Sequence, residues 1–214
     1  MNETRNKNNK VTLSGEIVSD FGFSHEIYGE KFYTADLKTI RKSNESDFIP
    51  IMVSDRFIDM KESWAGRFVR VSGQFRSCNR HEGERSRLIL SVFAREIETG
   101  EFEYEELRIK YNENCIFLDG YICKQIIYRK TPLGREIADM ILAVNRPYGK
   151  TDYIPCIAWG RNARFLCEFE VGARCAVWGR IQSRVYVKKV YETRSELRMA
   201  YEVSISKLEA VEAE

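Results

Sequence analysis

TDYIPCIAWGR, residues 151–161, is the stretch that decides the fold of this chain. Small apolar side chains alternate in it with larger ones at a period of two, which is typical of a β-strand with one buried face. The face expected to be buried carries Ile154, Cys156 and Ala158. The outward face carries Tyr153, Pro155, Ile157 and Trp159. A similar stretch, SDFIPIMVSDR, occurs 105 residues earlier at 46–56.

The rest of the chain repeats in the same way. VTLSGEI at 11–17 matches IFLDGYI at 116–122 with a shift of 105, and VSGQFRS at 71–77 matches VWGRIQS at 177–183 with a shift of 106. Self-similarity over this distance indicates duplicated domains of about 100 residues. The expected parts are a flexible N-terminus (1–10), a first domain (11–98), an acidic connector (99–114), a second domain (115–209) and a short acidic C-terminus (210–214).

Both copies are expected to be all-β. In the second copy, periodicity and turn residues predict strands over 116–122, 135–145, 152–159, 174–186 and 200–208. RNARFLCEFE at 161–170 has helical spacing instead, and its counterpart is DRFIDMKESWAG at 55–66. Three strands, a helix and two strands are the order of a five-stranded Greek-key barrel, the oligonucleotide-binding (OB) fold. We therefore predict two tandem OB-folds, each with a helix between its third and fourth strands, although another small β-barrel fits the pattern alone.

Charge is unevenly divided between the copies. Net charge over 214 residues is +2, but residues 11–98 hold 13 Lys and Arg against 14 Asp and Glu, whereas residues 115–208 hold 16 against 9. An excess of cations favours an anionic partner. The second domain is therefore the better candidate for a nucleic-acid surface.

Other features argue against secretion, membrane insertion and metal chemistry. No stretch approaches the roughly 20 apolar residues of a membrane span, and the first ten residues are polar. The six cysteines show no C-x-x-C spacing, so we expect reduced thiols in the cytoplasm. His25 and His81 lie far apart and near no cysteine pair. We expect no metal, no cofactor and no catalytic cluster of carboxylates or nucleophiles, hence no enzyme.

Three segments of the second domain carry a family resemblance. They are YRKTPLGREIADMILAVNR (128–146), TDYIPCIAWGR (151–161) and VGARCAVWGRIQSRVY (171–186). Their Thr-Pro-x-Gly turn, Ala-Val-Asn-Arg strand end and aromatic-Gly segment resemble those of bacterial single-stranded DNA-binding proteins. The resemblance implies a non-enzymatic OB-fold protein that coats single-stranded DNA in replication, repair or recombination, associated with the nucleoid.

The resemblance also implies a set of DNA-binding residues. Base-stacking positions fall on Tyr153 and Trp159, with Tyr148 in a loop and Tyr186 at the end of a strand. The accompanying cations are Arg146, Arg161, Arg180 and Arg184. Binding without sequence preference needs such aromatic faces beside a cationic track. Outward aromatics also serve as cross-strand pairs or interfaces, so packing is the competing interpretation. Trp178 is expected in the core.

The first domain departs from this pattern. Ser54 replaces Trp159, and Phe48 replaces Tyr153. Phe48 and Arg76 remain candidate DNA contacts, but the domain is equally well suited to assembly.

Partners follow from the same resemblance. Family members of the one-barrel type place four barrels around the DNA, so a two-barrel chain is expected to form a homodimer. Many members carry an acidic tail ending in Pro-Phe that recruits other proteins. This sequence ends in KLEAVEAE, so recruitment by that route is not expected. The alternative is a protein-interaction module of the primosome type with little direct DNA binding.

Overall fold

The computed structural model describes residues 8–82, 85–99, 113–191 and 194–212. Nearly all regular structure in these residues is β-strand, accompanied by one short α-helix and one 3-10 turn. Most of the expected N-terminal segment and acidic connector, and the last two residues, lie outside the described residues. No helix in the described ranges has the length and apolar character needed to cross a bilayer.

The first half of the chain closes its strands into a ring. β1 pairs with β5, β5 with β6, β6 with β4 in parallel, β4 with β3, and β3 again with β1. β2 extends this ring as a hairpin on β3. The strands are β1 (Asn9–Ile17), β2 (Gly22–Ile27), β3 (Glu30–Ile40), β4 (Ser46–Ser54), β5 (Phe68–Glu82) and β6 (Arg85–Thr99).

The second half repeats this ring with equivalent pairings. β7 pairs with β11, β11 with β12, β12 with β10 in parallel, β10 with β9, and β9 with β7, while β8 extends β9. The strands are β7 (Asn114–Ile122), β8 (Ile127–Lys130), β9 (Glu136–Asn145), β10 (Thr151–Trp159), β11 (Arg174–Tyr191) and β12 (Arg194–Ala210). The 3-10 turn η1 spans Pro147–Gly149 and the helix α2 spans Arg161–Leu166.

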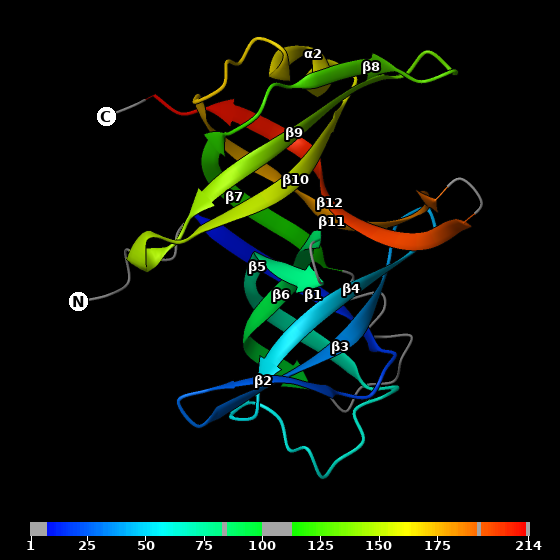
Figure 1. Ribbon diagram of the computed structural model, residues 1–214, viewed down its shortest axis with the longest axis vertical. Helices are drawn as coiled ribbons and strands as arrows, with labels where there is room; N and C mark the ends of the chain where they lie inside the picture. The colour runs from blue at the N-terminus through cyan, green and yellow to red at the C-terminus, as the bar shows by residue number, and fades with distance from the viewer. Residues whose placement is uncertain (1–7, 83–84, 100–112, 192–193, 213–214) are drawn as a thin grey trace.

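One strand pair joins the two halves into a continuous sheet. β1 runs antiparallel to β7 (Figure 1), and in this pairing Val11 lies opposite Ile116. Figure 1 also shows the β11–β12 hairpin reaching past its own half towards β4. The repeated halves are therefore related as two copies facing each other across β1 and β7, and their backbones form a single hydrogen-bonded unit.

Apolar alternation places the core inside each ring. Ile154, Cys156 and Ala158 are buried, as the sequence predicts, together with Leu142 from the neighbouring strand. Burying one such aliphatic side chain contributes about 1.5–3 kcal/mol. Gly120 lies where β7 passes from β11 to β9, and a Cβ there would lie 2.4 Å from the carbonyl oxygen of Ala143. The absence of a side chain at Gly120 therefore allows β7 to approach β9 and the ring to close.

The expected helix of the first half is wrong. Residues 55–66 form turns, whereas the second half has α2 with Ala163 and Leu166 buried. In the first half the Asp59 carboxylate accepts the Lys61 backbone N–H at 2.9 Å, and the Asp59 carbonyl accepts the Trp64 indole N–H at 3.0 Å. Such local bonds compete with helical ones. Burial of Trp64 then anchors the segment as a loop.

Candidate functional site

The outer face of β10 presents the two principal aromatic candidates. Tyr153 is 46% exposed and Trp159 is 40% exposed. Opposite them on β9 lie Ala143 and Ile137. Ile157 lies between them and is buried, so the face is apolar between two accessible rings. Two rings on one strand face, six residues apart, suit stacking against flat ligands.

Tyr148 and Arg146 lie together after β9 but differ in accessibility. Tyr148 is 94% exposed in η1, with φ at 64°. A hollow of about 270 Å³ is lined by Asn145, Arg146, Pro147 and Tyr148. Arg146 turns inward instead, so that its Nε lies 3.3 Å from Oδ2 of the fully buried Asp152. Burial raises the pKa of the Asp152 carboxyl, and the hydrogen bond from the Ser77 backbone partly opposes that rise.

The cations of β11 share one face, but that face is not purely cationic. Arg180 and Arg184 are exposed, whereas Gln182 between them is buried and donates to Glu202 at 2.8 Å. Arg184 lies 3.7 Å from Glu202 and 5.9 Å from the ring centre of Tyr186. Glu202 therefore reduces the positive charge on this strand. Tyr186 is half-buried, and Arg161 is exposed at the start of α2.

The two first-half candidates occupy different environments. Phe48 is 38% exposed at the position equivalent to Tyr153. Arg76 is half-buried, with its guanidinium 4.6 Å from the ring centre of Phe93 and a hydrogen bond to Gln74. Burial lowers the pKa of the Arg76 guanidinium to about 10, and the charges of Arg95 and Arg146 act in the same direction.

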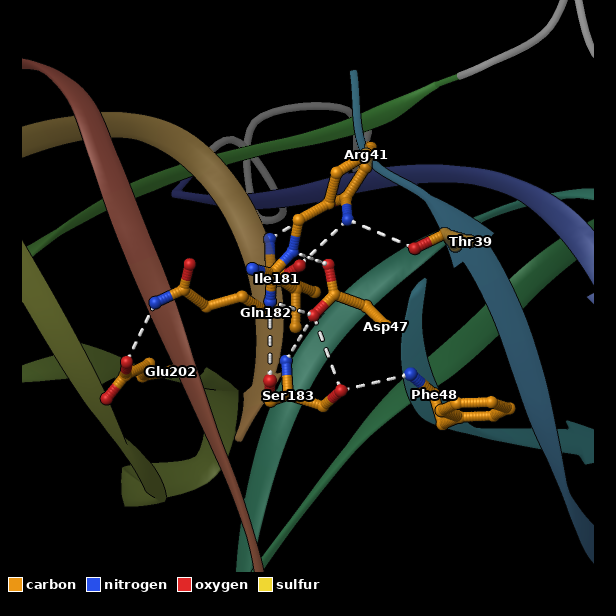
Figure 2. A network of polar contacts seen from close by, with 9 residues as sticks. Thr39, Arg41, Asp47, Phe48, Ile181, Gln182, Ser183 and Glu202 are labelled. Carbon is orange, nitrogen blue, oxygen red and sulfur yellow. Dashed lines mark hydrogen bonds and ion pairs between the residues drawn. The ribbon is translucent and has the colours of Figure 1, made fainter. Parts of the chain in front are cut away.

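Reciprocal polar contacts hold the halves together at two equivalent places. Figure 2 shows the first of them. There Asp47 accepts two hydrogen bonds from Arg41, at 2.7 and 2.6 Å, and one from the Ser183 backbone at 2.6 Å. The Phe48 N–H donates to Ser183 Oγ at 3.0 Å. We call this set, with Gln182 and Glu202, the Asp47 edge.

The second place repeats this geometry with exchanged halves. Asp152 accepts the Ser77 backbone N–H at 2.7 Å, and the Tyr153 N–H donates to Ser77 Oγ at 2.8 Å. We call Arg76, Ser77, Arg146 and Asp152 the Asp152 edge. Both strands that carry the candidate rings are thus fixed by the opposite half of the chain.

The prediction for Trp178 is wrong. Its side chain lies outside the ring, half-buried against Phe117 at 5.0 Å between ring centres, with Lys207 Nζ 4.5 Å from the indole. Inward residues of β11 have odd numbers, including Val177 and Ile181, because the register shift is taken up by β12. Trp178 is therefore a surface packing residue.

Sequence reasoning missed a groove on the first half. Its volume is about 610 Å³, and its lining includes Phe23, His25, Asp36 and Arg80. Phe23 is 61% exposed, and the His25 ring stacks on Phe32 at 5.0 Å. The available signal was the aromatic pair Phe21 and Phe23 beside His25, but β2 is short and exposed on both faces, so it has no apolar alternation.

Comparison with known proteins finds similarity in the second half. A profile of the Single-strand binding protein family matches residues 113–210. Single-stranded DNA-binding protein 3 of Listeria innocua is 35% identical over 91 residues, covering 37% of this chain and 57% of the relative. Single-stranded DNA-binding protein A of Bacillus subtilis is 35% identical over 80 residues, covering 34% and 46%. The chain spans about half the length of the curated relatives it matches.

A solved structure resembles nearly the whole chain. The wild-type single-stranded DNA binding protein from Thermus aquaticus aligns with a TM-score of 0.75, covering 96% of this chain and 94% of that one, at 18% identity. This likeness shows a shared fold that extends over both halves, including the first half, which lies outside the matched family profile.

Proposed function

We propose that this chain is a member of the single-strand binding protein family, whose profile matches residues 113–210, and that it binds and protects single-stranded DNA, largely without sequence specificity. The main structural support for this proposal is the pair of accessible rings, Tyr153 and Trp159, on the outer face of β10 within the matched residues. Binding alone, with no reaction, would serve replication, repair or recombination.

Base stacking and phosphate contacts would both contribute to the affinity for DNA. Each base stacked on an aromatic ring contributes about 1–3 kcal/mol, whatever the base, because every base has a π-face. Tyr148 and Tyr186 would extend the stacking surface, with Phe48 as a weaker contact in the first half. Arg161, Arg180 and Arg184, which are exposed, would contact phosphates, as would Arg76 and Arg146 at the junction. The affinity should therefore fall steeply with salt.

We also propose that each half is an OB-fold domain and that two chains associate as a homodimer. Equivalent rings of strands and the fold shared with the Thermus aquaticus protein support the two-domain arrangement. The homodimer rests on the analogy with family members that place four barrels around DNA. Native mass measurement with and without oligothymidylate tests it, and a monomer under both conditions would contradict it.

A single-tryptophan titration tests the DNA proposal. The chain has three tryptophans, and replacing Trp64 and Trp178 by phenylalanine leaves Trp159 as the reporter. Titration with unstructured oligothymidylate should quench its fluorescence, with a midpoint that shifts strongly with salt. The matched control replaces Trp159 and keeps Trp178, and it should show little quenching. Absence of oligothymidylate binding at low salt would contradict the proposal and favour the protein-interaction alternative.

A further inference from the structure

The two edges of the junction have equivalent backbones but different charges. Arg41 and Asp47 in the first half correspond to Arg146 and Asp152 in the second. The neighbouring positions differ: Gln182 at the Asp47 edge corresponds to Arg76, and Glu202 corresponds to Ser91. The charges of Arg41 and Arg184 balance those of Asp47 and Glu202. At the Asp152 edge, two arginines face one carboxylate, with the exposed Arg95 close enough to act on Arg76.

Hydrogen bonding also differs between the two edges, and it is less complete at the Asp152 edge. At the Asp47 edge, Arg41 donates two hydrogen bonds to its carboxylate through Nε and Nη2. At the Asp152 edge, Arg146 Nε and Asp152 Oδ2 form an ion pair at 3.3 Å without a hydrogen bond, and the buried Arg76 Nε has no hydrogen-bond partner among the described residues. A buried guanidinium donor without an acceptor is costly, so Arg76 favours an added anion beside the single carboxylate of this edge. Burial and the two nearby arginines also disfavour the charged form of Arg76, an effect that an anion would reverse.

The Asp152 edge is also open to a ligand. The hollow of about 270 Å³ beside Arg146 is bordered by the exposed ring of Tyr148. Arg76 precedes Ser77, whose hydroxyl accepts the Tyr153 N–H. Phosphates of a strand stacked on Tyr153 would therefore pass close to Arg76 and Arg146.

We propose that Arg76 and Arg146 together bind a phosphate group at the Asp152 edge, and that the Asp47 edge binds none. Guanidinium groups suit this ligand because they present paired donors to tetrahedral oxyanions. The phosphate is either a phosphodiester of the bound strand or a free phosphate ion. If the phosphate is a phosphodiester of bound DNA, the proposal rests on the proposed function. It then adds the place at which the DNA strand crosses from one half of the protein to the other.

Salt dependence of oligothymidylate binding tests the DNA form. The double variant Arg76→Gln with Arg146→Gln should lose one phosphate contact, so its slope of log K against log salt should be shallower by about 0.7. Between about 50 and 200 mM salt, this shrinks the loss of affinity by roughly 2.5-fold. Arg41→Gln is the matched control, because it removes the equivalent arginine from the balanced edge. It should lower the thermal midpoint but leave the slope unchanged.

Inorganic phosphate tests the free-ion form. Replacing chloride by phosphate at equal ionic strength should raise the thermal midpoint of the wild type and of Arg41→Gln more than that of the double variant, whose smaller rise reports the general stabilisation by phosphate. Asp152→Asn keeps the oxygen that accepts the Ser77 N–H and removes the competing charge, so it should tighten phosphate binding severalfold.

Different outcomes separate this inference from the proposed function. If the wild type binds oligothymidylate through Trp159, yet the double variant keeps the full salt slope and the same response to phosphate, the phosphate site is refuted alone. An equal loss of slope in Arg41→Gln also refutes it, because both edges would then be equivalent. If the wild type does not bind oligothymidylate, the proposed function fails, and the phosphate titration still decides whether the site exists.

Discussion

Replacing Asp47 by asparagine should destabilise the protein far more than replacing Asp152, although the two residues occupy equivalent positions. Asp47 is fully buried and accepts hydrogen bonds from Arg41 and from the Ser183 backbone. Asparagine preserves one acceptor for Ser183 but turns an amide N–H₂ towards Arg41. Breaking a buried charged pair costs about 3–5 kcal/mol, and the 22% exposure of the Arg41 side chain places this case near 3 kcal/mol.

Asp152→Asn has a smaller expected cost. Oδ1 of Asp152 accepts the Ser77 N–H, while Oδ2 has no hydrogen-bond partner among the described residues. Asparagine keeps the first contact and replaces an oxygen that is ion-paired with Arg146 at 3.3 Å without a hydrogen bond. It also removes a buried charge, whose desolvation raises the pKa of this carboxyl. Loss of the Arg146 attraction offsets that gain, so the net change should stay within about 1 kcal/mol.

Urea unfolding followed by far-ultraviolet circular dichroism measures both variants. At about 2–4 °C per kcal/mol for a chain of this size, Asp47→Asn should also lower the thermal midpoint by roughly 6–12 °C. Asp152→Asn should shift it by no more than a few degrees. Equal losses of unfolding free energy would refute the conclusion that the carboxylate is fully hydrogen-bonded at the Asp47 edge and incompletely hydrogen-bonded at the Asp152 edge. A larger loss in Asp152→Asn would refute it as well.

Three further predictions concern the pH dependence of stability, the need for glycine at position 120 and the contribution of each half to DNA affinity. The raised pKa of Asp152 means that the folded state takes up its proton more readily than the unfolded chain, so the wild type should gain stability relative to Asp152→Asn as the pH falls through that pKa. Urea midpoints between about pH 7 and pH 4 measure this, and a constant difference between the two proteins contradicts it. Gly120→Ala should cost about 1–3 kcal/mol because its Cβ would lie 2.4 Å from the Ala143 carbonyl oxygen. Gly22→Ala, whose Cβ meets nothing nearer than 4.0 Å, is the control, and equal unfolding free energies for the two variants would overturn the closure argument. Tyr153→Ala should weaken oligothymidylate binding by about 5- to 150-fold, and Phe48→Ala by less than about 3-fold, in fluorescence titrations. Equal losses would show that the halves bind alike.

Phe75 is unsuitable as a control in such comparisons. It belongs by sequence to the same segment as Arg76, but it is fully buried in the first ring, with its backbone bonded to the Asn9 side chain. Replacing it by alanine would remove a core ring at a cost of about 3–5 kcal/mol. Any loss of DNA binding would then report unfolding.

Local alternation predicted much of the fold and the principal site. The period of two along residues 151–161 separates Tyr153 and Trp159 from the buried Ile154 and Cys156, because successive side chains of a strand point to opposite faces. The same rule failed at Trp178, where the parity alone does not say which face lies inside. It also failed at residues 55–66, where bonds made by Asp59 hold a loop in place of a helix.

Sequence alone predicted the internal repeat, the β-rich class, the second half as the half that resembles the family, and the bounds of β7, β9 and β10 to within two residues. These properties follow from patterns within short segments and from their repetition. β11 and β12 extend beyond the predicted 174–186 and 200–208. Only the tertiary structure decided whether residues at matching positions of the two halves have the same surroundings. Arg41 and Arg146 occupy matching positions, yet their surroundings come from the opposite half of the chain, about 140 residues away from Arg41 in the case of Ser183. Side chains brought together over such distances set the charge balance and hydrogen bonding of each edge, and no local pattern encodes them.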